Sequence, residues 1–260
     1  MKKIRFLALA MTFCLATACF LTGTVAKYNT GDAAEDSATA AKWGVNLEVS
    51  GTLFGEKYLA NSNTPTEDAD GVSVVSSSVG INVVAPGTKS SADGMKIELS
   101  GTTEVAVDVK FVITDTDGSD ATDVYLAAGT YTDYTDLSIN NATFELAEMY
   151  YPIKYTLTQT KEGEEPNKLV DGKTLADVVT ALQQLTTNCD NIAANTDLAK
   201  EIGTLVLTWE WAFEQNKDAA DTLLGKLADN SQTDTGVTTG TADYNLTPDI
   251  KITVTVTQVD

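Results

Sequence analysis

The segment Ile250-Lys-Ile-Thr-Val-Thr-Val256 alternates apolar and polar residues with a period of two. This period places apolar side chains on one face of a β-strand and polar ones on the other, which is typical of antiparallel sheets with one buried face. The same alternation recurs six times along the chain, at 43–49, 79–83, 95–99, 105–113, 153–157 and 205–213. Seven such strands separated by turns predict an all-β fold, in the form of a jelly-roll-like antiparallel β-sandwich.

Short helices interrupt this pattern in two places. Thr174-Leu-Ala-Asp177 has the spacing of a capping box, and apolar residues follow it at helical intervals. A second helix is predicted after Asp218, whose carboxylate favours the positive end of a helix. We therefore expect helical insertions at about 174–200 and 216–229 within one β-sandwich domain that spans residues 43–260.

The N-terminus has the features of a secretory signal peptide. Lys2, Lys3 and Arg5 precede an uncharged run of 16 residues, 6–21, and small residues follow it. The run is shorter than the ~20 residues that a spanning helix needs. We expect residues 1–26 to be removed by a signal peptidase after Ala26 or Lys27, which would give a secreted, extracellular or cell-surface protein with no membrane anchor. Residues 27–42 are polar and rich in alanine, and they predict a mobile N-terminal arm.

The charge of the processed chain narrows the range of functions. The whole chain has 17 Lys and Arg, 37 Asp and Glu, and no His. Removing residues 1–26 leaves 14 Lys against 37 acids, a net charge of −23, and no Arg. Without His, neither zinc metallopeptidase motifs nor Ser-His or Cys-His nucleophile systems can form. A field this negative also repels phosphate backbones, so nucleic acid is not an expected partner.

The strongest candidate for a metal site is the acidic segment Asp115-Thr-Asp117-Gly-Ser-Asp120-Ala-Thr-Asp123. Carboxylates two or three residues apart with a glycine between them suit Ca²⁺. The spacing differs from an EF-hand loop and lacks its bidentate Glu, so an acidic hairpin loop without metal is the alternative. No catalytic group is expected, and calcium is the only cofactor that the sequence suggests.

Both ends of the predicted domain have unprotected strands. Trp43, Val45, Leu47 and Val49 alternate cleanly behind the arm, and the strand from Ile250 to Val256 carries a single Lys. Free edges recruit other strands unless charge or proline protects them. We expect residues from about Tyr28 to Val49 to add a strand to the next copy, with these four residues as anchors in a head-to-tail filament. The alternative is that residues 43–49 pair within their own chain and the protein stays monomeric.

Several strings resemble the TasA/camelysin family of secreted proteins. They are Leu21-Thr-Gly-Thr-Val-Ala-Lys-Tyr28, Asp36-Ser-Ala-Thr-Ala-Ala-Lys-Trp43-Gly-Val45, Val84-Ala-Pro-Gly87, Ile97-Glu-Leu-Ser-Gly101 and Glu104-Val-Ala-Val107. The resemblance implies a jelly-roll subunit of extracellular biofilm fibres, processed by a SipW-type signal peptidase and assembled by donation of its N-terminal segment. An accessory matrix protein is a further implied partner. Some relatives carry a metallopeptidase label, so a carboxylate-held metal peptidase and a monomeric calcium-binding adhesin module remain the alternatives.

Overall fold

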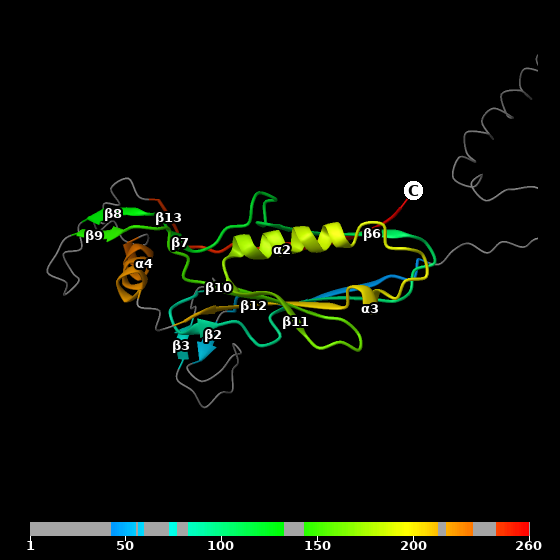
Figure 1. Cartoon of the computed structure of the whole chain (residues 1–260). Helices are drawn as coiled ribbons and strands as arrows, with labels where there is room; N and C mark the ends of the chain where they lie inside the picture. The colour runs from blue at the N-terminus through cyan, green and yellow to red at the C-terminus, as the bar shows by residue number, and fades with distance from the viewer. Residues whose placement is uncertain are drawn as a thin grey trace, which may run out of the picture. The chain divides into compact units, whose positions relative to one another are not determined.

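The largest sheet is antiparallel and supplies one wall of the core (Figure 1). A computed structural model describes residues 43–55, 57–59, 73–76, 83–132, 143–212, 217–230 and 243–259. All of them belong to one compact unit, Ala41–Asp260. The sheet has the order β1-β5-β12-β10-β11, and β4 pairs with the end of β12. Its strands are β1 (Asn46–Gly51), β4 (Thr88–Lys89), β5 (Met95–Ser100), β10 (Lys154–Thr160), β11 (Asn167–Lys173) and β12 (Thr204–Trp211).

Four two-stranded antiparallel sheets accompany it. Strand β6 pairs with β14, β7 with β13, β2 with β3, and β8 with β9. Their bounds are β2 (Lys57–Leu59), β3 (Ser73–Ser76), β6 (Val107–Thr114), β7 (Tyr125–Leu126), β8 (Gly129–Thr132), β9 (Thr143–Leu146), β13 (Tyr244–Asn245) and β14 (Lys251–Gln258).

Three helices complete the described structure: α2 (Leu175–Asn188), α3 (Leu198–Glu201) and α4 (Asp218–Asn230). The first two match the predicted insertion at about 174–200 to within one residue, and α4 overlaps most of the one predicted at about 216–229. The Asp177 carboxylate accepts hydrogen bonds from the Thr174 N–H and hydroxyl, which satisfies the start of α2. No helix in the part of the chain that the structure describes is long and apolar enough to cross a membrane.

The core forms where the apolar faces of these elements meet. Leu205, Leu207, Trp209 and Trp211 of β12 are buried, and so are Val107, Val109 and Phe111 of β6. Helix α2 contacts β6, β10 and β11, so it covers the β10–β11 side of the large sheet. The prediction of an all-β fold is confirmed at the level of class, since antiparallel strands dominate and the helices are few.

Candidate functional site

Strand β1 forms an edge of the large sheet, and its apolar side chains lack a cover. Leu47 is opposite Leu99 and Val49 is opposite Ile97 in the β1–β5 register. Residues directly opposite in an antiparallel pair point to the same face, and Leu99 and Ile97 are buried in the core. Leu47 and Val49 therefore point inward, yet 36% and 51% of their surfaces are exposed. The inner face of β1 is thus an apolar surface that stays partly exposed in the structure.

Strand β14 presents a free edge. It pairs with β6 through eight residues, from Lys251 opposite Thr114 to Gln258 opposite Val107. The N–H groups of Val107, Val109 and Phe111 point away from β14, since they donate to the Ile192 and Cys189 carbonyls and to the Thr186 hydroxyl. The backbone N–H and C=O groups of the β6 residues between these three point toward β14. Thr253 and Thr255 of β14 therefore form hydrogen-bonded pairs with β6.

This alternation leaves the backbone groups of Ile252, Val254 and Val256 on the outer edge of β14. Within the described residues, no strand pairs with that edge. The side chains of these three residues are half-buried against the core. The edge thus offers a row of free N–H and C=O groups beside apolar side chains.

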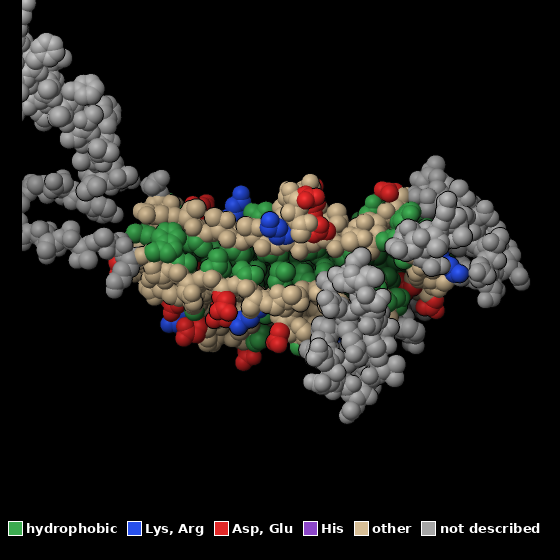
Figure 2. Space-filling view, turned by 180° about the vertical axis from the view of Figure 1, so that it is seen from behind, with side chains coloured by type: hydrophobic (Ala, Val, Ile, Leu, Met, Phe, Trp, Pro, Cys, Tyr) green, Lys and Arg blue, Asp and Glu red, His purple; other side chains and the backbone are tan. Residues whose placement is uncertain are grey.

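The free edge of β14 and the uncovered face of β1 lie on the same side of the core. Helix α2 contacts β6 together with β10 and β11. Because β14 pairs with β6 on the edge opposite α2, it extends away from β11, toward the β5–β1 side of the large sheet. Figure 2 shows a stripe of hydrophobic side chains running between two more polar layers on one face of the molecule. We call the free edge of β14 together with the inner face of β1 the strand groove.

Among the described strands only β6 pairs with β14, so the backbone groups on the outer edge of β14 are those with which a further strand would pair. A strand paired to Ile252–Val256 would lie over the inner side of β5 and β1. It would satisfy the free backbone groups of β14 and remove Leu47 and Val49 from water. Main-chain hydrogen bonds with alternating side-chain pockets are the recognised mode of β-strand addition.

A pair of glycines fixes the point where the preceding chain enters β1. Gly44 has φ of 64°, and a Cβ there would lie 2.0 Å from the Thr102 carbonyl oxygen. At Gly101 a Cβ would lie 2.1 Å from the Gly44 carbonyl oxygen. This close backbone approach holds the segment before β1 against the end of β5.

The structure places the predicted donor residues within their own chain. Leu47 and Val49 pair with β5 of the same chain, Val45 is half-buried against the core, and Trp43 is 43% exposed. The pairing of β1 with β5 already satisfies its hydrogen-bonding edge, and this differs from the expected donation of Leu47 and Val49. The arm 27–42, the signal peptide and its cleavage site at Ala26 or Lys27 lie outside the described residues.

The predicted calcium ligands do not converge. The Asp115 carboxylate accepts a hydrogen bond from the Ser119 N–H, at 2.7 Å, inside its own loop. Asp117 and Asp120 are exposed, whereas Asp123 is buried. No group of three or more His, Cys, Asp or Glu side chains within the described ranges is close enough to hold a metal ion. The segment is an acidic loop whose last carboxylate turns into the core.

Asp123 is a carboxylate buried beside the large sheet. It is 5% exposed, and its Oδ1 accepts hydrogen bonds from the Tyr155 hydroxyl at 3.0 Å and the Val124 N–H at 2.8 Å. Burial raises the pKa of Asp123 to about 6, although both hydrogen bonds and Lys154 act in the opposite direction. Sequence spacing grouped Asp123 with its exposed neighbours, because alternation does not reveal a buried carboxylate in a loop.

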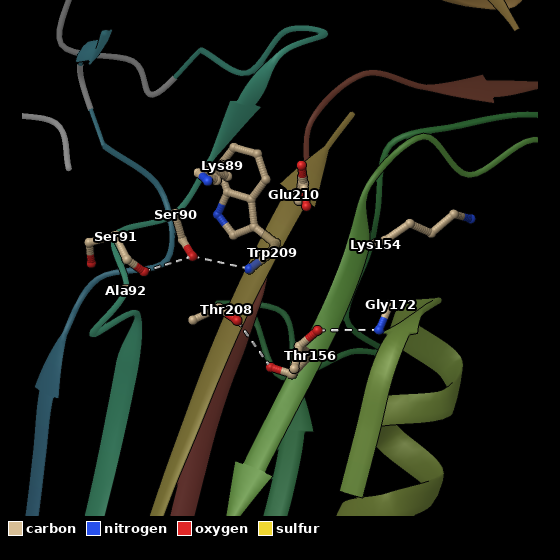
Figure 3. Close-up of a pocket in the computed structure, with 10 residues that line it drawn as sticks. All are labelled: Lys89, Ser90, Ser91, Ala92, Lys154, Thr156, Gly172, Thr208, Trp209 and Glu210. Atoms are coloured by element: carbon tan, nitrogen blue, oxygen red, sulfur yellow. Dashed lines mark hydrogen bonds between the residues drawn. The ribbon is translucent and has the colours of Figure 1, made fainter. Parts of the chain in front are cut away.

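Figure 3 shows a hollow on the outer face of the large sheet, with a volume of about 250 Å³. Glu210 of β12 lies between Lys89 and Lys154 in the register of three neighbouring strands. The Ser90 hydroxyl accepts from the Trp209 N–H and donates to the Ser91 carbonyl. The Ser90 hydroxyl therefore joins the residue after β4 to β12, and it is used in the structure of the sheet.

Comparisons of the chain with protein-family models, with curated proteins and with solved structures give no match. The inference of function therefore rests on the sequence and on the geometry of the strand groove.

Proposed function

We propose that the protein is a secreted structural subunit of extracellular fibres. In each contact of the fibre, the N-terminal arm of one copy, residues 27–42, adds a strand to β14 of the next copy. The observation that carries the proposal is the strand groove, in which a free eight-residue edge lies on the same side of the core as uncovered inward-facing Leu47 and Val49.

The occupant of the groove follows from the length of the arm and its attachment. Sixteen residues precede Trp43 in the processed chain. Fully extended, they reach ~50 Å at ~3.3 Å per residue, against ~26 Å for the length of β14. The arm is therefore long enough to leave its own subunit and still cover a complete groove. Because donor and acceptor are different surfaces, the contact is heterologous, and it produces an open filament when the rotation between copies does not close into a ring.

This proposal modifies the expectation from sequence in one respect. Residues 46–51 stay in their own sheet as β1, where they form a wall of the acceptor groove, and the donated segment is confined to the arm before them. The jelly-roll interpretation, the signal peptide and the resemblance to the TasA/camelysin family agree with an exported fibre subunit.

The test is a proline substitution on the free edge of β14. Val254→Pro removes the central outward N–H and leaves the hydrogen-bonded pairs with β6 at Thr253 and Thr255 in place. Val254→Ala is the matched control, because it loses side-chain volume but keeps the N–H. We expect filaments from the processed wild type and from Val254→Ala in electron micrographs, and only monomers from Val254→Pro.

A deletion of residues 27–41 tests the donor side. This variant is expected to remain folded by circular dichroism and to form no filaments alone. A synthetic peptide of residues 27–42 is expected to bind it and to stop the assembly of wild type. Filaments that persist in both the deletion and the proline variant would exclude strand addition at β14.

A further inference from the structure

A cavity separate from the strand groove lies between the start of α2 and the end of β6, with a volume of about 540 Å³. Its apolar wall includes Ile113 of β6 and Leu175 and Val179 of α2. Tyr125 and Tyr151 also line it, and their ring centroids are 6.0 Å apart. A hollow of this size with an apolar wall and a few polar groups has the character of a small-molecule site.

The polar part of this cavity is acidic. Asp123 lines it, and Asp120 lies on its exposed side. Asp123 Oδ1 is hydrogen-bonded, but Oδ2 is buried and has no hydrogen-bonding partner among the described residues. A buried carboxylate oxygen without a partner costs free energy that a cation or donor would recover.

The charges around the cavity favour a cation over an anion. None of the described residues that line it is basic. The positive end of α2 is occupied by the Asp177 carboxylate, which accepts from Thr174. Lys154 acts on Asp123 from outside this cavity, because its side chain lines the hollow on the outer face of the sheet.

We propose that this cavity, which we call the amine site, binds a primary ammonium group on an aliphatic stem. The ammonium pairs with the carboxylates of Asp123 and Asp120 beside the rings of Tyr125 and Tyr151, which attract cations through their faces. The stem lies along Ile113 and Val179. The same chemistry is presented by a free aliphatic amine and by a lysine side chain of another protein chain.

The test compares n-butylamine with 1-butanol, which has nearly the same shape and no charge. Binding to the processed protein is measured by isothermal titration and by NMR shifts of the tyrosine rings. Saturable binding of butylamine is expected, with affinity at least tenfold above that of butanol. Asp123→Asn is expected to abolish this preference, and Asp117→Asn, in the same loop but outside the cavity, is expected to preserve it.

A second variant guards against a folding defect in Asp123→Asn. Val179→Lys fills the cavity from a half-buried position on α2 and supplies its own ammonium, so butylamine is expected not to bind.

Nα-acetyl-lysine amide distinguishes the two sources of the ammonium group. Binding at least as tight as that of butylamine identifies a lysine side chain as the ligand. Weaker binding of the lysine derivative identifies a free amine. Equal binding of butylamine and butanol, or unchanged amine binding in Val179→Lys, would overturn the proposal. Because neither variant alters β14 or the arm, filament formation is scored separately.

Discussion

At the residue scale, the Asp123–Tyr155 pair joins the end of the acidic loop to the centre of the large sheet. Tyr155 is fully buried in β10, and its hydroxyl donates to Asp123. The Asn245 side-chain amide donates to the Asp123 carbonyl at 2.8 Å, which adds the segment before β14 to the same junction. Ionisation of Asp123 is therefore coupled to the stability of the fold.

This coupling gives a pH prediction with a definite sign. The pKa of Asp123 is about 6 in the folded protein, against ~3.9 in an unfolded chain. The folded state therefore holds the Asp123 proton more tightly than the unfolded state does. The contribution of Asp123 to the free energy of unfolding falls as pH rises from about 4 to about 6. Each unit of pKa difference corresponds to ~1.4 kcal/mol. Between pH 4 and pH 7, the free energy of unfolding of Asp123→Asn should therefore rise by on the order of 2–3 kcal/mol relative to that of wild type.

Urea unfolding of both proteins at the two pH values measures this difference. Other acidic groups are present in both proteins and cancel, including Asp221, whose pKa is also raised by burial. Asp117→Asn, an exposed change in the same loop, should show no such gain. A constant difference between Asp123→Asn and wild type would show that Asp123 titrates normally in the folded state.

At the element scale, β6 is paired on one edge by β14 and covered on the other by helix α2. The Thr186 hydroxyl accepts from the Phe111 N–H at 2.9 Å and donates to the Phe111 carbonyl at 3.2 Å. The Cys189 and Ile192 carbonyls accept from Val109 and Val107 further along the strand. The Thr186 side chain of α2 thus takes the place of a neighbouring strand at this edge of β6. The free edge of the β6–β14 pair is therefore the outer edge of β14.

Replacing Thr186 with Val should destabilise the fold by about 1–3 kcal/mol. The isosteric side chain leaves the Phe111 N–H and carbonyl without partners, and a buried unpaired group costs about that much. Thr187→Val is the control, since the Thr187 hydroxyl is exposed and donates only to the Gln183 carbonyl on its own helix. Thermal unfolding of the two variants tests this prediction, and a lower melting temperature is expected for Thr186→Val than for Thr187→Val. Equal melting temperatures would mean that water replaces the Thr186 hydroxyl at the β6 edge.

The elements also show what alternation in a sequence reveals. It identified β5, β6, β10, β12 and β14 and the face that each buries, because the period of two records burial directly. It did not reveal which strands pair. Residues 43–49 were expected either to add a strand to the next copy or to pair within their own chain. In the structure β1 pairs with β5 of the same chain, and alternation alone could not choose because partner choice depends on contacts distant in sequence. Of the strand groove, the sequence predicted only the unprotected C-terminal edge. The cavity between α2 and β6 was not predicted, because residues distant in sequence form it together.

At the scale of the whole molecule, the negative charge of the chain after residue 26 would oppose the proposed assembly. Each copy has 14 Lys and 37 acids after residue 26. The free edge of β14 has a single charged residue, Lys251, and is otherwise neutral. A contact at this edge would therefore be local and largely uncharged. Repulsion between copies would act over the Debye length, which is about 10 Å at 0.1 M salt and about 30 Å at 0.01 M.

We therefore expect salt to accelerate filament formation. Between 0.01 and 0.3 M NaCl, light scattering of the processed protein should show a shorter lag and faster growth, because screening weakens repulsion between copies while leaving strand pairing intact. Val254→Pro should show no growth at any salt concentration, which separates strand addition from salt-induced aggregation. Growth that slows as salt rises would mean that attraction between opposite charges, and not an apolar strand groove, holds the filament together.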